Sequence, residues 1–140
     1  MATRTEWAIR RAKQDDRDAV LKLWESVGLS GADELEWQAL TNGAAARLLV
    51  SHEGEQLAGT AVAAYDGWRA YIYHVAVAPF TRGRGLGKVL MAEAEAQLVN
   101  QGARRAYVEV HEANTDGLAL CTISGFEPEG EIALVKELRG

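Results

Sequence analysis

The sequence predicts a single α/β (α+β) domain, residues 1–140, with helices flanking a mixed, mostly antiparallel sheet of six or seven strands. Two observations predict this fold class. Runs rich in β-branched and aromatic residues alternate with segments whose apolar residues recur at helical spacing, and no repeat or linker divides the chain. A Gly-rich turn also joins one β-rich run to a long helical pattern and a further strand, as in a parallel crossover.

The first elements are a strand and two helices. A strand is expected at 7–12, and a helix follows that is capped by Asp15 or Asp16 and ends at Gly28. The apolar residues of this helix recur at helical spacing and are Val20, Leu23, Trp24 and Val27. A second, short helix is expected from Asp33 to about Leu40.

Three strands come next. The segments 47–52 and 57–65 have strand patterns and are joined by a turn at Glu53-Gly54. Asp66-Gly67 lies between two β-rich runs and predicts a hairpin in which both turn residues have positive φ. A strand from 68 to 77 should therefore run antiparallel to the one before it.

After this strand the spacing of the apolar residues changes from that of a strand to that of a helix. Over 85–101 the apolar residues Leu86, Leu90, Ala94 and Leu98 recur every four positions, and Gly102 ends the pattern. A strand is expected at 105–110, and a short helix at 114–125 that Asn114 caps and Gly125 ends. The last strand is expected at 132–138.

Composition excludes several classes of protein. The formal net charge is −5 and the pI about 5.2, which argues against a surface that binds nucleic acid through clustered Lys and Arg. The first residues lack the apolar core of a signal peptide, and no segment approaches the roughly 20 apolar residues that span a bilayer. We therefore expect a cytoplasmic protein with no membrane partner. Neither the lone cysteine nor the three histidines have metal-ligand spacing, so no metal is expected.

The stretch "TRGRGLGK" (81–88) predicts a local site for an anion, because glycines let backbone N–H groups at a helix start approach a ligand. A P-loop is excluded because Arg82 and Val89 break its pattern, and a dinucleotide fingerprint because Lys88 replaces its third glycine. An RNA-binding Arg-Gly segment and a purely structural turn stay open at this point.

Residues 82–87 fit the pattern R/Q-x-x-G-x-G/A, and "NTDGLALCTISGF" (114–126) is similar to N-x-x-A-x-x-L-Y-x-x-x-G-F. In these motifs, and in "IRRAKQDDRDAVLKLW" near its start, the chain resembles the GCN5-related N-acetyltransferase (GNAT) superfamily. The resemblance covers nearly the whole chain. It implies a sheet that splays open at an acetyl-CoA site, with acetyl-CoA as the co-substrate and its pyrophosphate as the anion at the loop.

The resemblance also implies which residues bind the coenzyme. The strand segment at 75–77 would bulge and offer backbone groups to the pantetheine arm, while Arg84 and Lys88 would add charge and Arg82 would brace the loop. The implied coenzyme-binding residues are Val75, Ala76, Val77, Arg82, Gly83, Arg84, Gly85, Leu86, Gly87, Lys88 and Asn114.

The predicted catalytic residues are Glu109, Cys121 and Tyr73. An amine nucleophile must lose a proton before it attacks a thioester, and the resemblance gives Glu109 the role of general base. It is also open whether Glu109 is only a solvated strand residue. Tyr73, with Tyr71 and His74, is a reserve candidate for positioning or proton relay.

Cys121 stands where the family usually has a tyrosine that protonates the departing thiolate. It can act as that acid, pack as a small buried residue, or form an acyl-enzyme, and the sequence leaves all three open.

The expected function is acetyl-CoA-dependent transfer of an acetyl group to a primary amine by direct attack in a ternary complex. The alternative is a coenzyme A-binding sensor or regulatory module with little catalysis, since the usual tyrosine is missing. The acceptor would be an amine of a small molecule or of a protein or peptide. Acidic residues could steer a cationic amine, or could simply solvate the surface: Asp33, Glu34, Glu36, Glu127, Glu129 and Glu131. Members of the family commonly form homodimers, so the resemblance also implies one.

Overall fold

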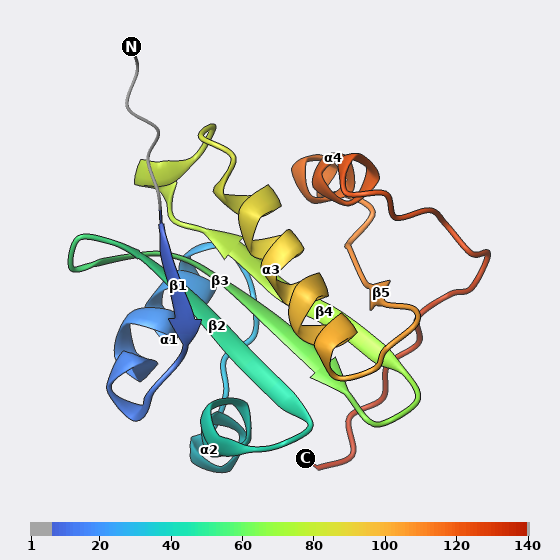
Figure 1. Ribbon diagram of the computed structural model, residues 1–140, viewed down its shortest axis with the longest axis horizontal. Helices are drawn as coiled ribbons and strands as arrows, with labels where there is room; N and C mark the ends of the chain where they lie inside the picture. The colour runs from blue at the N-terminus through green and yellow to red at the C-terminus, as the bar shows by residue number, and fades with distance from the viewer. Residues whose placement is uncertain (1–6, 140) are drawn as a thin grey trace.

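The computed structural model describes residues 7–139 and contains one five-stranded sheet in the order β1-β2-β3-β4-β5 (Figure 1). Successive strands pair antiparallel from β1 to β4, and β4 pairs parallel with β5. The predicted mixed, mostly antiparallel sheet is confirmed, with five strands in place of six or seven. The strands are β1 (Ala8–Arg11), β2 (Ala46–Glu53), β3 (Gln56–Tyr65), β4 (Ala70–Val77) and β5 (Tyr107–Val108).

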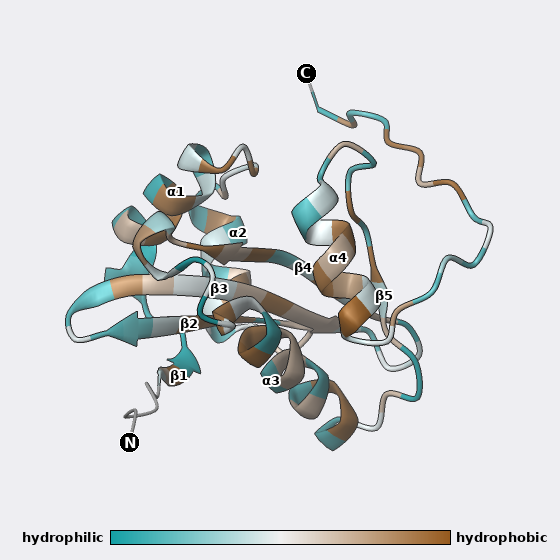
Figure 2. Cartoon of the chain, turned by 90° about the horizontal axis from the view of Figure 1, so that it is seen from above, coloured by the Kyte–Doolittle hydropathy of each residue, from teal (hydrophilic) through white to brown (hydrophobic). Residues whose placement is uncertain are grey.

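Helices cover both faces of this sheet (Figure 2). Helices α1 (Arg17–Ser26) and α2 (Glu34–Asn42) lie on one face, and α3 (Leu86–Asn100) crosses the other. Helix α4 (Thr115–Ile123) follows β5, and short 3₁₀ turns at Gln14–Asp16 and Pro79–Thr81 complete the elements. The predicted β4–α3–β5 crossover with parallel strands is confirmed.

Each face of the sheet buries its own apolar cluster. On the α3 side, small sheet residues such as Ala61 and Ala63 pack against Leu90 and Leu98. A Cβ on Gly59 of β3 would lie 2.8 Å from the Ala76 carbonyl oxygen and 2.8 Å from Leu90 Cδ1. The missing side chain at position 59 therefore leaves room for Leu86 and Leu90 of α3 to pack on the sheet. On the other face the cluster includes Val20, Trp24, Trp37, Leu48 and Val62.

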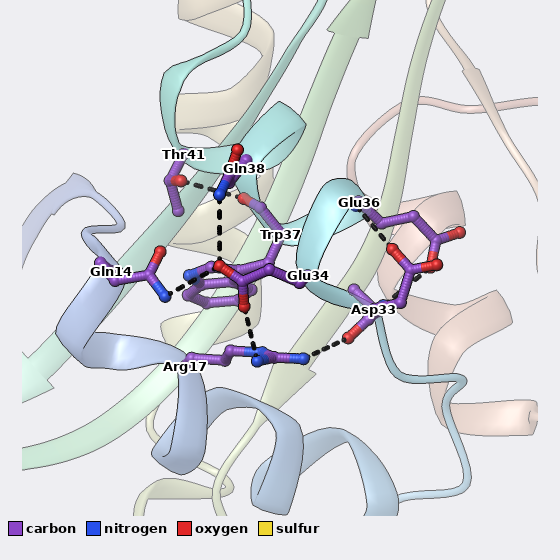
Figure 3. Close-up of polar contacts among 9 residues, drawn as sticks. Gln14, Arg17, Asp33, Glu34, Glu36, Trp37, Gln38 and Thr41 are labelled. Atoms are coloured by element: carbon purple, nitrogen blue, oxygen red, sulfur yellow. Dashed lines mark hydrogen bonds and ion pairs between the residues drawn. The ribbon is translucent and has the colours of Figure 1, made fainter.

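Helix α2 begins in a polar network that fixes its first turn (Figure 3). The Asp33 carboxylate accepts a hydrogen bond from the Glu36 N–H at 2.8 Å, and the Glu36 carboxylate accepts one from the Asp33 N–H at 2.8 Å. This reciprocal capping box satisfies two donors at the helix start. Arg17 of α1 pairs with Glu34 at 2.8 Å and links the two helices.

Two turn details differ from the sequence prediction. Asp16 precedes α1 without capping it, because its carboxylate instead accepts hydrogen bonds from Arg10 and from the Lys13 N–H. The β3–β4 turn is centred on Gly67-Trp68, with a hydrogen bond from the Asp66 N–H to the Arg69 carbonyl. Of the turn residues, only Gly67 has positive φ. The Asp66 carboxylate accepts hydrogen bonds from the Trp68 and Arg69 N–H groups and thereby stabilises this form of the turn.

The predicted strand at 132–138 is wrong, and the one at 105–110 shrinks to two residues. Within residues 7–139 β5 is an edge strand and is only two residues long, so it offers too short an edge for a further strand to pair with. Residues 127–139 form exposed coil with no helix or strand (Figure 1). Their apolar side chains are 83–92% exposed and belong to Ile132, Leu134, Val135 and Leu138.

No helix within residues 7–139 has both the length and the apolar character needed to cross a bilayer.

Candidate active site

The glycine loop before α3 has the geometry of an anion-binding helix start. Gly83 and Gly85 have φ of +78° and +87°, and a Cβ on either would meet no atom within 4 Å. Gly85 occupies the N-cap position of α3, and no side chain caps this end of the helix in the described structure. Free N–H groups of the first turn therefore face an open surface, where a partial positive charge favours an anion.

Gly87 is small for a different reason. A Cβ there would lie 3.2 Å from Leu120 Cδ2 of α4 and 3.7 Å from Val77 Cγ2 of β4. The missing side chain at 87 thus lets α3 pack against α4 and the end of β4. Leu86 is buried in the α3-side core.

The three basic residues of the loop differ in their partners. Arg84 pairs with Glu53 at the end of β2, and its guanidinium carbon lies 5.4 Å from the centre of the Trp7 ring. The Arg84 hydrogen bond lowers the pKa of Glu53. Arg82 and Lys88 are exposed, and neither forms an ion pair with a carboxylate within residues 7–139. Arg84, rather than Arg82, ties the loop to the sheet.

Strand β4 bulges beside this loop. Val62 of β3 pairs with Tyr73 and Thr60 pairs with Ala76, so His74 and Val75 together oppose Ala61. Such a bulge bends a strand and changes the direction of its peptide groups. Val75 and Val77 pack by their side chains against the α3-side core, while Ala76 belongs to the opposite cluster.

Strands β4 and β5 part next to the bulge. Their last paired residues are Ile72 and Val108, and β4 continues to Val77 without that partner. The predicted splay of the sheet is therefore present. The separation opens at the same end of β4 as the glycine loop.

Glu109 follows β5 and is exposed, while its neighbours Val108 and Val110 pack against the α3-side core. This is the alternation expected from the sequence. Glu109 also lines a cavity of about 780 Å³, whose other walls are Arg69, Tyr71, Glu95, residues 105–108 and residues 124–133. The reserve candidate Tyr71 and the acidic residues Glu127, Glu129 and Glu131 also line this cavity, whereas Cys121, Tyr73 and the predicted coenzyme-binding residues do not.

Cys121 and Tyr73 have different surroundings. Cys121 lies in α4 with 8% of its surface exposed, and burial raises the pKa of its thiol. Tyr73 of β4 is 37% exposed, and partial burial raises the pKa of its phenol. Both groups therefore remain protonated at neutral pH.

Asn114 caps α4, as expected for a residue at that position. Its side-chain oxygen accepts a hydrogen bond from the Gly117 N–H at 2.9 Å. A Cβ on Gly117 would lie 2.5 Å from the Asn114 amide nitrogen, so the alanine of the family pattern would require the Asn114 side chain to shift from this position.

Within the described part of the chain, no group of three or more His, Cys, Asp and Glu side chains is placed to hold a metal ion.

Sequence comparison identifies the family. Residues 7–126 match the sequence model of the Acetyltransferase (GNAT) family. This chain belongs to the GNAT family. The GNAT match spans the sheet, the glycine loop, α3 and α4, and ends at Phe126, before the exposed coil.

Solved structures share this GNAT fold. A putative acetyltransferase from Agrobacterium tumefaciens is 16% identical, with a TM-score of 0.79 over 93% of this chain and 99% of that one. The enzyme AAC(6')-Iy, solved with the bisubstrate analogue CoA-S-monomethyl-acetylneamine, is 16% identical, with a TM-score of 0.79 over 95% and 99%. The ribosomal-protein-S18-alanine N-acetyltransferase from Escherichia coli is 20% identical, with a TM-score of 0.75 over 87% and 78%.

Sequence reasoning missed two features of this site. One is the pairing of Arg84 with Glu53, which only the fold brings together. The other is a buried contact between Thr60 and the bulge at His74, for which a lone threonine in an apolar strand gives no signal.

Proposed function

We propose that this protein is an acetyl-CoA-dependent N-acetyltransferase that moves an acetyl group to a primary amine by direct attack in a ternary complex. The observation that carries the proposal is the open loop at Gly83 and Gly85, which leads into the uncapped start of α3 where β4 parts from β5. This combination suits a pyrophosphate at the loop and an extended arm along β4.

The residues of this loop fit the coenzyme. No Cβ fills the space at Gly83 or Gly85, and the exposed side chains of Arg82 and Lys88 can contribute positive charge. The backbone of Val75–Val77 would hold the pantetheine arm. Acetyl-CoA, when bound, supplies the thioester that an amine attacks.

Glu109 is the proposed general base. It takes a proton from the attacking ammonium or amine, a bond forms between the amine nitrogen and the acetyl carbon, and the bond from that carbon to sulfur breaks. Its exposure beside the cavity of about 780 Å³ supports access to a bound amine.

The departing thiolate then takes up a proton. Cys121 and Tyr73 are the candidate donors, and both are protonated at neutral pH because burial raises the pKa of each. Tyr73 is the more exposed of the two. This favours Tyr73 over Cys121 as the group that meets solvent and substrate.

The acceptor class rests on fold relatives and surface charge. AAC(6')-Iy was solved with a bisubstrate analogue that contains acetylneamine, and the Escherichia coli enzyme is named for an alanine of ribosomal protein S18. We propose an amine of either kind. Asp33, Glu34 and Glu129 engage in a helix cap or ion pairs, which reduces their capacity to steer a cation.

A coenzyme-binding sensor is the second candidate, favoured by the buried cysteine at the position of the family's usual acid. A thermal-shift assay with acetyl-CoA, followed by thiol release across an amine panel, separates the two. Ligand at 100 times its dissociation constant should stabilise the protein by about 2.7 kcal/mol. Absence of any shift at millimolar acetyl-CoA would exclude both functions, and a shift without thiol release would favour the sensor.

We also propose a cytoplasmic location, since a lone free cysteine suits a reducing compartment. A homodimer, which sedimentation at micromolar concentration tests, stays a prediction.

A further inference from the structure

A buried chain of polar contacts joins α1 to the bulge of β4. The indole N–H of Trp24 donates a hydrogen bond to Thr60 Oγ1 at 2.9 Å, and the Thr60 hydroxyl donates one to the His74 carbonyl oxygen at 2.9 Å. Trp24 is 1% exposed and Thr60 is fully buried. The Thr60 hydroxyl thus donates its single proton to the His74 carbonyl and accepts a hydrogen bond from the Trp24 indole, so the orientation of the hydroxyl is fixed.

His74 has an unusual backbone. Its φ is +50°, and it is the one non-glycine residue with positive φ within residues 7–139. This conformation costs free energy in an L-residue and persists only where the surroundings hold it. The Thr60 hydroxyl donates to the carbonyl of this same strained residue, which lies opposite Ala61, a residue that pairs with Leu49 of β2 but has no register partner in β4.

The His74 side chain is held from a different segment. Its Nε2 lies 2.9 Å from the carbonyl oxygen of Ser30, which assigns a proton to Nε2, and its ring stands edge-on to Trp24 at 4.7 Å. Ser30 lies in the segment that joins α1 to α2. Main chain and side chain of His74 are therefore held by separate contacts, and Trp24 takes part in both.

We propose that Trp24, Thr60 and His74 form a positioning unit, which sets the direction of the β4 peptide groups at Val75–Val77. His74 precedes this segment directly, so a rotation at His74 changes the direction of the N–H and C=O groups that follow. The role in binding the pantetheine arm rests on the proposed function, whereas the anchoring of the backbone does not. Because these residues act through the backbone of others, they are positioning residues.

The substitution Thr60→Val tests the unit, since it keeps the side-chain shape and removes the hydroxyl. Thr60→Ser restores the hydroxyl, and His74→Asn tolerates positive φ but loses the ring contacts. Thr41→Val is the matched control. Thr41 is also buried, on the same face of the sheet, and its hydroxyl donates to the Trp37 carbonyl at 2.9 Å in α2 (Figure 3).

The first measurement is amide hydrogen exchange over residues 73–78 in the free protein. We expect Thr60→Val to speed exchange there by about tenfold or more, with Thr60→Ser and Thr41→Val unchanged. Equal exchange in Thr60→Val and the wild type would overturn the anchoring role, whatever the protein catalyses. If Thr60→Val does not fold, His74→Asn decides by the same comparison.

The second measurement is calorimetric affinity for coenzyme A, with steady-state rates on an amine that the wild type acetylates. Thr60→Val should weaken coenzyme affinity about tenfold and lower kcat at saturating acetyl-CoA by up to about 100-fold, and Thr60→Ser should recover both. Faster exchange with unaltered affinity and kcat would overturn the positioning role. A wild type that acetylates no amine would refute the proposed function, while exchange and affinity would still decide the positioning unit.

Discussion

Arg84, in the middle of the glycine loop, is paired with Glu53 at the far end of β2, and its guanidinium carbon stands 5.4 Å from the centre of the Trp7 ring. The pair fastens the loop to the β2–β3 hairpin. It also neutralises Arg84, so the positive charge that faces a ligand belongs mainly to Arg82, Lys88 and the start of α3.

This pairing predicts unequal effects of charge removal. Lys88→Met should weaken coenzyme A binding about three- to tenfold and flatten its salt dependence, because an exposed, unpaired charge is lost. Arg84→Met should change the salt dependence less, since Glu53 already offsets that charge. Calorimetry between about 50 and 300 mM salt, over which the Debye length falls from about 14 Å to about 6 Å, checks the order. A larger salt effect for Arg84→Met would mean that the ion pair opens when coenzyme binds.

Gly85→Val should abolish coenzyme A binding in a folded protein. The side chain would project into the open space before α3 and block backbone approach. A β-branched residue at φ of +87° also costs about 1–2 kcal/mol of stability. Gly102→Val is the control, because Gly102 has φ of +100° at the opposite end of α3 and equally open space. Similar melting temperatures with binding lost only in Gly85→Val are expected, and retained binding would refute the loop assignment.

Glu109→Gln should keep coenzyme affinity and lower turnover by about 10²–10⁴-fold, since it removes the group that accepts the amine proton. The loss should be greatest at low pH, where fewer amine molecules are deprotonated unaided. Steady-state rates between about pH 6 and 9 measure it. Glu112→Gln, another exposed carboxylate nearby, should leave turnover unchanged. If Glu109→Gln turns over at the wild-type rate, Glu109 is not the general base, and the candidates become Tyr73, His74, His111 or a water chain.

Cys121→Ala should reduce turnover little if the thiolate leaves unaided or takes its proton from Tyr73. Its cost in stability should be about 1 kcal/mol, because the site is buried. Cys121→Tyr restores the family's usual residue but must fit a large ring where only 8% of the cysteine is exposed, which overpacks the core by about 1–3 kcal/mol. Denaturant unfolding and rates measured well below the melting temperature separate the two effects. A stable, faster Cys121→Tyr protein would show that the acid position is open after all.

Asp16 predicts a pH-dependent part of stability. The hydrogen bond from Arg10 lowers the pKa of Asp16 below its usual 3.8. The contribution is therefore fully present above the usual pKa and is lost as pH falls through the lower folded value. Asp16→Asn should reduce the free energy of unfolding at pH 7 by about 1 kcal/mol, a difference that should vanish in strong acid. Urea unfolding at several pH values checks this, with the exposed Asp15→Asn as control. A constant difference down to acid pH would contradict the ionic origin.

Local signals predicted the elements that depend on a few neighbouring residues. Gly85 and Gly102 bracket α3, and Asp33 with Glu36 starts α2, as their capping chemistry requires. The segment 132–138 has the composition of a strand, but the free sheet edge at β5 is only two residues long, and composition cannot report the length of that edge.

Side-chain partners far apart in sequence were equally beyond prediction. Positive φ is uncommon in any non-glycine residue, so a histidine inside a strand pattern does not announce the strained backbone that Thr60 and Ser30 hold. Gly87 was assigned to the coenzyme by its motif, yet its nearest neighbour is Leu120 of α4. The motif shows that glycine is expected at position 87, but it does not show which neighbouring group would clash with a side chain there.

The exposed coil after α4 has a consequence for colloidal behaviour. Ile132, Leu134, Val135 and Leu138 form a run of β-favouring side chains in water, the kind of segment that initiates aggregation between chains. Charged residues interrupt and flank it: Glu129 and Glu131 before, Lys136 and Glu137 within. These charges act as gatekeepers against edge-to-edge association. The concentration at which this protein stays dispersed should therefore depend more on a few charges near its C-terminus than on its overall charge of −5.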